Sequence, residues 1–293
     1  MNVSDYDYLR KLLKDRSGLV LAADKEYLVE SRLLPIARRL GVANLGELVA
    51  RLKEPSVEPI IVEVVEAMTT NESFFYRDKI PFDQFRNHII PRLIQSRANE
   101  RRIRIWCAAA ATGQEPYSLA MIIKEIGRQL AGWRIEIIGT DLSVEVIEKA
   151  KAGVYSQFEV QRGLPIQMLL KYFSQQGETW QISPEIKTMV QFRALNLLED
   201  FAHLGRFDVV FCRNVLIYFN NETKIDVLQR IARNTAPDGF LTLGAAETVV
   251  GLTDAFRPST ELRGVCLPNA AALRSMAGGR LDVLQPIAAA GAR

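Results

Sequence analysis

Apolar residues recur at spacings of three and four through residues 1–70 of the chain. The spacing occurs in the segments YDYLRKLLKDR, KEYLVESRLL, LGELVARLK and EPIIVEVVEAM. It places the apolar side chains on one face of an α-helix. The pattern therefore predicts an all-helical N-terminal domain over residues 1–70, in which Pro35 is expected to kink a helix or restart one.

The pattern changes after Met68. Segments with helical periodicity now alternate with short apolar runs rich in β-branched or aromatic residues, which are residues 103–108, 134–141, 189–195, 207–213 and 239–245. Strands alternating with helices indicate an α/β fold with a mainly parallel, doubly wound, Rossmann-like sheet. Residues 153–190 interrupt the alternation and predict an inserted subdomain. The Ala- and Gly-rich residues 269–293 are expected to form a flexible tail.

The composition supports a folded protein with a large apolar core. Of 293 residues, 48% are hydrophobic and 24% are charged, and the net charge of +3 is too small to indicate nucleic acid as a partner. The N-terminus lacks a signal-peptide pattern, and no run approaches the ~20 apolar residues of a membrane span, so we expect a cytoplasmic protein without membrane insertion. Cys107, Cys212 and Cys266 lie far apart in apolar runs, which favours core positions in a reducing compartment over a metal site.

The segment WCAAAATGQEPYS (residues 106–118) lies between a predicted strand and a predicted helix, where nucleotide-type ligands usually bind. Its alanines let the backbone approach a ligand, but alanine adopts a positive φ only at a cost, so we expect a path different from that of G-x-G-x-x-G loops. Glu115 at the start of the helix would repel a pyrophosphate and attract a cation, which favours S-adenosylmethionine. The residues alone leave open the alternative that Glu115 only complements the helix N-terminus.

Polar residues also follow the predicted strands, at the edge of the sheet where ligands bind. Asp141 ends its strand about 30 residues after the loop, a position that favours hydrogen bonds to ribose hydroxyls over a role as a helix N-cap. Arg213 and Asn214 end the most apolar strand, where they are costly to bury unless they hold a partner. Asn196 follows the preceding run, and an amide can read the edge of an adenine ring.

A further polar group precedes the first strand. In MTTNESFFYR, Asn71, Ser73 and Arg77 surround an aromatic pair. Because they belong to the linker between the helical domain and the sheet, they are placed to close over a bound ligand. Taken alone, the segment is also typical of a capped helix start.

The chain resembles the CheR-type chemotaxis receptor glutamate methyltransferases in an ordered set of motifs, TTNESFFYR, IWCAAAATGQEPYSLAM, GTDLS, YSQFEVQRGLP, ALNLLE and FDVVFCRNVLIYF. The resemblance covers roughly residues 5–268. It implies that residues 1–70 contact receptors and that residues 71–268 form a class I S-adenosylmethionine-dependent methyltransferase domain, with residues 153–190 as its insertion. The implied reaction is methyl transfer from S-adenosylmethionine to glutamate side chains on cytoplasmic helices of chemoreceptors, with S-adenosylhomocysteine as the product.

The resemblance also carries over a set of cofactor-binding positions, which here are Asn71, Ser73, Arg77, Glu115, Asp141, Asn196, Leu197, Arg213 and Asn214. Arg77 is also expected to orient the substrate carboxylate. One position departs from the family pattern, because Ala111 stands where a serine is usual. A hydroxyl contact to the cofactor is therefore expected to be missing.

The implied reaction needs no strong general base, because a glutamate carboxylate is already ionised at pH 7. This agrees with the lack of a Ser/His/Asp arrangement, and we interpret His88 and His203 as structural or surface residues. Two alternatives remain at this point. One is a methyltransferase acting on another substrate, and the other is a non-catalytic S-adenosylmethionine-binding module in signalling.

The helical domain carries a candidate surface for an acidic partner. Residues 1–70 hold ten Lys or Arg and eleven Asp or Glu, so the domain as a whole is balanced. Lys25, Arg32 and Arg39 are nevertheless seven residues apart and would form one row on a helix, to which Arg38 adds. Such a row suits acidic receptor helices, and a merely solvated face is the alternative. We expect a monomer whose compact insertion does not bind a receptor C-terminal peptide.

Overall fold

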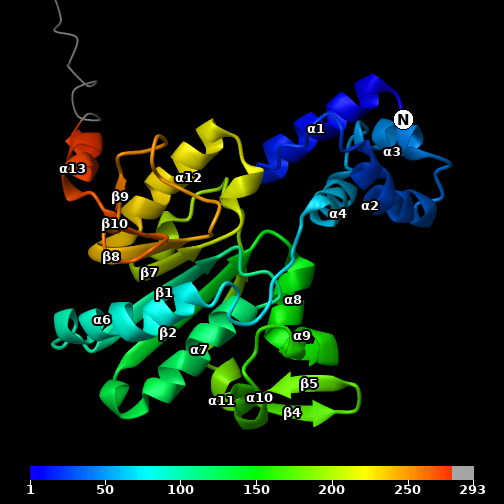
Figure 1. The fold of residues 1–293 in the computed structure, drawn as a ribbon. Coiled ribbons are helices and arrows are strands. Elements are labelled where there is room, and N and C mark those ends of the chain that lie inside the picture. Colours follow the sequence, from blue (N-terminus) through cyan, green and yellow to red (C-terminus); the bar gives the residue numbers. More distant parts are fainter. Residues whose placement is uncertain (279–293) are drawn as a thin grey trace, which may run out of the picture.

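The computed structural model describes residues 1–278, and the N-terminal part of the chain is helical (Figure 1). Its helices are α1 (Val3–Ser17), α2 (Glu26–Arg39), α3 (Leu45–Leu52) and α4 (Glu58–Met68). The side chains of Asn2 and Asn44 cap α1 and α3 by accepting hydrogen bonds from backbone N–H groups of the first turn. The apolar faces of the four helices bury one common cluster, to which Leu9, Leu33 and Leu48 contribute.

Helix α2 runs through Pro35, so of the two expected outcomes, a kink or a restart, the restart does not occur. A proline inside a helix removes one backbone hydrogen bond and strains the preceding turn. Here Leu33, Ile36 and Ala37, on either side of the proline, are buried in the domain core. We infer that this packing holds the helix together across Pro35.

A central sheet organises the rest of the described chain, with the strand order β6-β2-β1-β7-β8-β10-β9. Its strands are β1 (Arg102–Ala108), β2 (Arg134–Asp141), β6 (Val190–Ala194), β7 (Phe207–Cys212), β8 (Thr235–Leu243), β9 (Phe256–Pro258) and β10 (Val265–Pro268). The five neighbouring strands β6, β2, β1, β7 and β8 are parallel. Strand β10 is antiparallel to both β8 and β9. The predicted mainly parallel, Rossmann-like sheet is confirmed. Strands β9 and β10, which have three and four residues, were not predicted.

Two hydrophobic cores lie on opposite faces of this sheet. Along β1, Ile103 and Ile105 join one core, whereas Trp106 and Ala108 join the other. The first face is covered by α5 (Ile80–Gln84), the π-helix η1 (Phe85–Ile89), α6 (Ile90–Ser96), α7 (Gln114–Ile126) and α8 (Val144–Ala152). Helix α12 (Asn221–Arg233) packs on the second face. Short 3-10 helices complete the connections, namely η2 (Gly127–Leu130), η3 (Ala202–Leu204) and η4 (Leu216–Tyr218).

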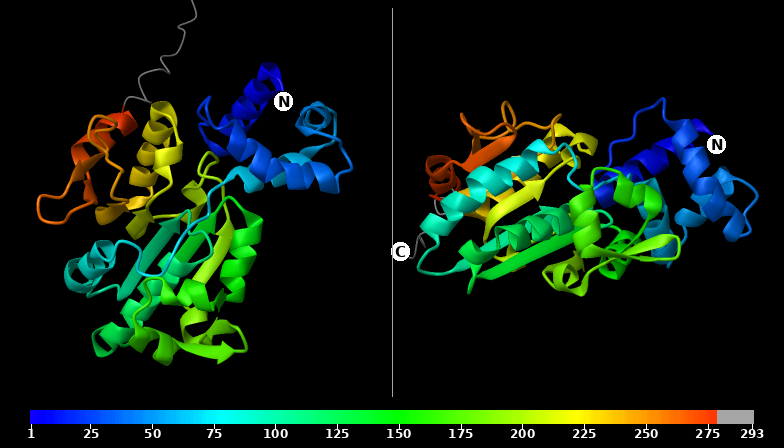
Figure 2. Two further views of the ribbon diagram at one scale, coloured as in Figure 1. Left: turned by 45° about the vertical axis from the view of Figure 1, so that its right-hand side comes forward. Right: turned by 60° about the horizontal axis from the view of Figure 1, so that its bottom comes forward.

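The segment between α8 and β6 forms a small separate sheet. Its elements are β3 (Val154–Ser156), α9 (Gln157–Gln161), α10 (Ile166–Tyr172), β4 (Phe173–Gln176), β5 (Thr179–Ile182) and α11 (Pro184–Lys187). Strand β5 pairs antiparallel with both β3 and β4. Figure 2 shows the N-terminal helices beyond the carboxyl ends of the central strands. The space between these parts is where a ligand would bind in this architecture.

The C-terminal residues that the structure describes end in helix α13 (Ala270–Gly278). Leu273 of this helix packs against the core on the α12 face of the sheet. The first part of the predicted flexible tail is therefore a helix, and its remainder, residues 279–293, lies outside the described residues. In residues 1–278, no helix combines the length and the apolar character that a membrane crossing requires.

Candidate functional site

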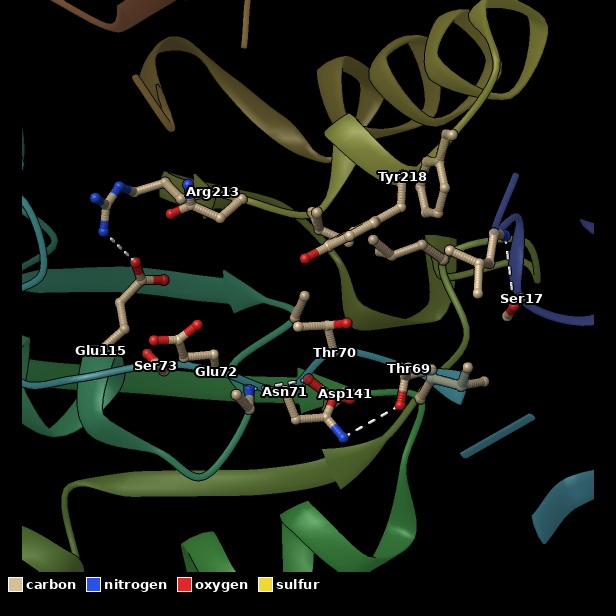
Figure 3. Close-up of a pocket in the computed structure, with 18 of the residues that line it drawn as sticks. Ser17, Thr69, Thr70, Asn71, Glu72, Ser73, Glu115, Asp141, Arg213 and Tyr218 are labelled. Atoms are coloured by element: carbon tan, nitrogen blue, oxygen red, sulfur yellow. Dashed lines mark hydrogen bonds and ion pairs between the residues drawn. The ribbon is translucent and has the colours of Figure 1, made fainter. Parts of the chain in front are cut away.

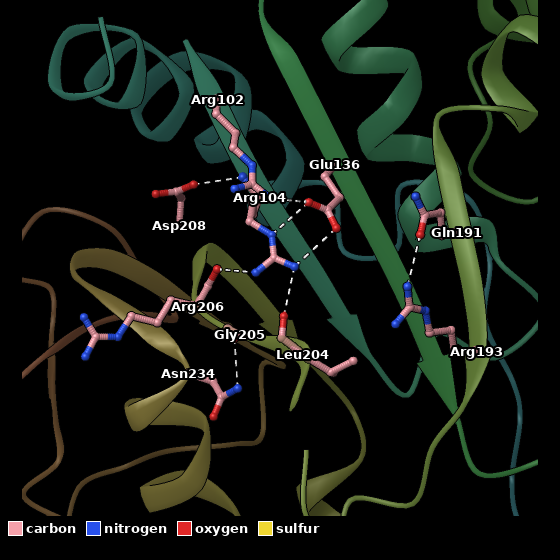
Figure 4. A network of polar contacts seen from close by, with 10 residues as sticks. All are labelled: Arg102, Arg104, Glu136, Gln191, Arg193, Leu204, Gly205, Arg206, Asp208 and Asn234. Atoms are coloured by element: carbon pink, nitrogen blue, oxygen red, sulfur yellow. Dashed lines mark hydrogen bonds and ion pairs between the residues drawn. The ribbon is translucent and has the colours of Figure 1, made fainter. Parts of the chain in front are cut away.

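A pocket opens at the carboxyl ends of β1, β2, β6 and β7 (Figure 3). The chain runs from β1 to β2 and β6 on one side and returns to β7 on the other, so the pocket lies at the point where strand order reverses. It is lined by all of the predicted cofactor-binding residues, Asn71, Ser73, Arg77, Glu115, Asp141, Asn196, Leu197, Arg213 and Asn214. The helical domain contributes Ser17 and Leu19 to the wall.

The alanine-rich loop after β1 takes a left-handed path that the sequence analysis did not expect. Ala109 has φ 62° and Ala111 has φ 47°, so alanine adopts here the conformation that glycine usually supplies. Each such residue costs about 1–2 kcal/mol. One compensating contact is the hydrogen bond that the Ala111 N–H donates to Asp141 Oδ2 over 2.9 Å.

Asp141 is the buried anchor of this loop. Its side chain accepts hydrogen bonds from the N–H groups of Ala111 and Ser143, at 2.9 and 3.1 Å. Burial raises the pKa of Asp141, although these backbone N–H groups oppose the shift. Ser143, not Asp141, supplies the N-cap of α8, so the alternative N-cap role does not apply to Asp141.

Glu115, at the start of α7, forms a buried ion pair with Arg213. Arg213 Nη1 lies 2.8 Å from Glu115 Oε2, and Arg213 Nη2 lies 2.7 Å from Asp78 Oδ2. Burial raises the pKa of Glu115, and the Arg213 guanidinium acts in the opposite direction. Arg213 Nε is buried and has no hydrogen-bond partner among the described residues. Glu115 is therefore more than a helix-terminal charge, because it belongs to a charged cluster on the pocket wall.

The linker after α4 passes across the pocket. Asn71 donates a hydrogen bond to Thr69 Oγ1, and Arg77 donates one to the Glu72 carbonyl over 2.8 Å. The Arg77 guanidinium lies 5.6 Å from the Phe74 ring centre. These local contacts hold the linker in place while leaving Arg77 on the pocket wall.

Asn196 and Asn214 line the opposite wall. The Asn196 amide donates to the Arg16 carbonyl over 2.8 Å and accepts from the Leu198 N–H. The Asn196 side chain thus joins the strand ends to the helical domain. The sequence predicted only a contact with the edge of an adenine ring for this amide. Asn214 has φ 58°, another left-handed non-glycine residue at the pocket.

A comparison with protein-family models matches two regions of the chain. Residues 4–69 match the CheR methyltransferase all-alpha domain, and residues 71–265 match the CheR methyltransferase SAM binding domain. The chain belongs to the CheR methyltransferase family. S-adenosylmethionine is therefore its cofactor.

Curated relatives support this membership over most of the CheR chain. Chemotaxis protein methyltransferase 1 of Pseudomonas aeruginosa is 43% identical over 87% of this chain and 93% of its own length. Chemotaxis protein methyltransferase Cher2 of Pseudomonas putida is 41% identical over 86% and 93%. Chemotaxis protein methyltransferase of Vibrio parahaemolyticus is 38% identical over 87% and 94%.

Several residues that shape this CheR pocket were not among the sequence predictions. Ser17, Leu19, Tyr218 and Phe219 line it, and the Val20 N–H donates to the Tyr218 carbonyl over 2.9 Å. This contact joins segments that are about 200 residues apart in sequence, so no local pattern could reveal it. The local sequence feature that pointed to Tyr218 and Phe219 was the segment VLIYF, which follows the predicted strand ending at Arg213.

Two of the four residues in the predicted basic row are engaged within the helical domain. Arg32 donates to the carbonyls of Met68 and Thr69, at 2.7 and 2.9 Å. Arg39 pairs with Glu63. Arg38 is exposed, and no ion pair to it is found in the part of the chain that the structure describes.

The remaining candidates do not line the pocket. His88 and His203 are both exposed. All of the cysteines are free thiols in buried positions, as the sequence analysis expected, and they are Cys107, Cys212 and Cys266.

Proposed function

We propose that this protein transfers a methyl group from S-adenosylmethionine to glutamate carboxylates of chemoreceptors and so forms glutamyl methyl esters. The observation that carries the proposal is the convergence of the family's cofactor positions on one pocket at the switch point of the sheet. The relatives named chemotaxis protein methyltransferase support the biological setting.

The chemistry of the pocket fits the cofactor. Asp141 has acceptor oxygens for ribose hydroxyls, and the Glu115 carboxylate offers a negative charge to a cationic ligand. Apolar side chains provide a wall for the adenine ring, and they are Leu19, Leu142, Leu195, Leu197, Val215 and Phe219. Figure 3 shows the charged pair Glu115 and Arg213 at one end of the pocket and Tyr218 and Ser17 at the other. We therefore assign the charged end to the amino-acid part of the cofactor and the apolar end to its base.

When bound, S-adenosylmethionine supplies a methyl group that a substrate carboxylate oxygen takes by direct displacement, leaving S-adenosylhomocysteine. The residues of the chain have to orient the two reactants and exclude water, since no proton is removed from the nucleophile. Arg77 is our candidate for orienting the incoming carboxylate, because it lines the pocket and its guanidinium is partly exposed. The Phe74 ring and the Glu72 carbonyl hold this guanidinium on the wall.

We assign receptor contact to residues 1–70 and catalysis to residues 71–268, with residues 153–190 as an inserted subdomain. The proposed receptor-facing cations are Arg38 and Lys25, whereas Arg32 and Arg39 act mainly inside the domain. A substrate on cytoplasmic receptor helices places the enzyme in the cytoplasm. We propose that it acts as a monomer, since the pocket is complete within one chain.

The first test is calorimetric titration of S-adenosylhomocysteine into the purified protein. We expect one site with micromolar or tighter affinity, roughly −8 kcal/mol, and at least tenfold weaker binding by Asp141→Ala. Asp254→Ala, at an exposed position away from the pocket, is the matched control. No binding by the well-folded wild type would overturn the site assignment.

The second test follows the reaction itself. Methyl-labelled S-adenosylmethionine and chemoreceptor should give base-labile label on receptor glutamates, with Arg77→Ala lowering the rate more than the affinity for S-adenosylhomocysteine. Binding of the cofactor without transfer to any receptor would contradict the proposed reaction and leave a non-catalytic role.

A further inference from the structure

One carboxylate outside the pocket holds four backbone N–H groups at the ends of two strands. Glu247 lies in the turn after β8. Its Oε2 accepts hydrogen bonds from the N–H groups of Asn214 and Gly244, both at 2.8 Å. Its Oε1 accepts from Val215 at 2.9 Å and from Leu216 at 2.8 Å. Glu247 thus ties the turn that follows β7 to the end of β8.

The turn held in this way forms part of the pocket wall. Arg213, Asn214 and Val215 all line the pocket, whereas Glu247 does not. Asn214 has φ 58°, a conformation that L-residues adopt at a cost and that its surroundings must impose. The N–H groups of Asn214 and of the two residues after it all point to the Glu247 carboxylate. In the described chain no Lys or Arg forms an ion pair with Glu247, so these N–H groups are its partners.

We propose that Glu247 is a positioning residue for the cofactor pocket. It fixes the left-handed turn at Asn214 and thereby the placement of Arg213 and Asn214 toward the ligand. Hydrogen bonds to a charged acceptor are roughly twice as strong as neutral ones, which suits a role in holding a strained turn. This inference rests on the proposed function, because the ligand that reports on the pocket is the cofactor product.

Gly244 offers a second way to disturb the turn that Glu247 holds. A Cβ atom at this position would lie 2.7 Å from Glu247 Oε2 and 3.0 Å from the Asn214 backbone nitrogen. Both distances are shorter than ordinary van der Waals contact. Gly244→Ala would therefore displace the carboxylate without removing it, and its methyl group would also crowd the side-chain nitrogen of Asn214 at 3.0 Å.

The experiment compares Glu247→Gln, Glu247→Asp and Gly244→Ala with the wild type. The amide in Glu247→Gln turns a donor toward the backbone N–H groups. The matched control is Glu222→Gln, at an exposed position near the start of α12. For each protein, calorimetry gives the Kd of S-adenosylhomocysteine, thermal unfolding gives the Tm, and initial rates give KM and kcat for each substrate.

We expect Glu247→Gln and Gly244→Ala to raise the Kd and the KM for S-adenosylmethionine at least tenfold. The KM for receptor should change less than twofold, Glu247→Asp should recover part of the loss, and Glu222→Gln should match the wild type. A merely structural role would lower the Tm without changing the Kd of the folded protein, and that result would overturn the inference.

The two proposals can fail separately. If the wild type binds S-adenosylhomocysteine and Gly244→Ala and Glu247→Gln bind it equally well, the inference about Glu247 fails while the proposed function stands. If the folded wild type does not bind, both fail. Should Glu247→Gln not fold, Gly244→Ala and Glu247→Asp decide the question by the same measurements.

Discussion

Two buried carboxylates in the pocket connect the chemistry of single residues to pH. Burial raises the pKa of Glu115 above its ordinary 4.5 and that of Asp141 above its ordinary 3.8. A protonated Glu115 can no longer attract a cationic ligand. Cofactor affinity should therefore fall on acidification at a pH above the one at which an ordinary glutamate titrates.

The matching variant is Glu115→Gln, for which we expect about tenfold weaker binding of S-adenosylhomocysteine at pH 7, since a contact to a charged group is lost. Its affinity should also depend less on pH, with Asp141 as the remaining buried carboxylate. Calorimetry over a pH series measures both effects. An unchanged pH dependence in the variant would contradict the assignment.

The raised pKa of Glu115 also affects the stability of the fold. Because the folded pKa of Glu115 is raised, the folded state keeps its proton to a higher pH than the unfolded chain does. The contribution of this group to stability is therefore present below the unfolded pKa and is lost as pH rises through the folded pKa. In Glu115→Gln, this part of the pH dependence of the unfolding free energy should be absent in denaturant titrations.

Ala111 provides a second prediction at this scale. The backbone N–H of Ala111 makes the hydrogen bond that ties the loop to Asp141, and a serine at this position keeps that N–H group. Restoring the family's usual hydroxyl with Ala111→Ser should thus add one neutral hydrogen bond at most, worth about 0.5–1.5 kcal/mol. We expect calorimetry to show a gain in affinity of about tenfold or less. A larger gain would mean that the alanine had impaired the site.

Individual elements show how the insertion supports the pocket. Gly163, between α9 and α10, has φ 82°, and a Cβ atom there would lie 2.1 Å from the Phe75 carbonyl oxygen. Arg162 lies 4.4 Å from the Phe74 ring centre and pairs with Glu72 over 2.7 Å. The insertion therefore packs directly against the linker that crosses the pocket.

Gly163→Ala should displace this linker, because the new Cβ atom would clash with the Phe75 backbone, which cannot move aside as a flexible side chain can. We expect a loss of at least about 2 kcal/mol of unfolding free energy and weaker binding of S-adenosylhomocysteine. Gly177→Ala is the matched control, since Gly177 has φ 62° but nothing within 4 Å of its Cβ position. It should cost only the conformational strain of about 1 kcal/mol. Equal losses in denaturant titrations would refute the close-contact argument.

Helices and strands differ in how well the sequence could predict them. The apolar runs of β1, β2 and β7 were found because each is buried on both faces. The short strands β9 and β10 lack such a run, and the helices at residues 80–96 are divided by a π-helical turn. The cofactor-binding candidates were predicted from motifs. Ser17 and Tyr218, which line the same pocket, and Glu247, which does not, were missed because their contacts are tertiary and leave no local pattern.

At the scale of the whole molecule, the helical and methyltransferase parts share the pocket. The Asn196 amide donates to the Arg16 carbonyl, and Glu66 accepts from the Val144 N–H over 2.6 Å. Ser17 and Leu19 line the same pocket as the strand ends. A ligand in this pocket therefore contacts both parts of the chain, so cofactor binding should stabilise their arrangement. The surface that we propose for the receptor, around Arg38, does not line the pocket.

This division allows receptor binding to be tested separately from cofactor binding. Arg38 is exposed on α2 and does not line the pocket, so Arg38→Glu should leave the Kd of S-adenosylhomocysteine unchanged. If acidic receptor helices contact this surface, the charge reversal should raise the KM for receptor about tenfold and weaken its dependence on ionic strength. Arg51→Glu makes the same change at an exposed position on α3 and serves as the control. An unchanged receptor KM in Arg38→Glu would place the receptor contact elsewhere. An equal rise in both variants would indicate an effect of net charge, because both carry the same net charge and differ only in where the charge lies.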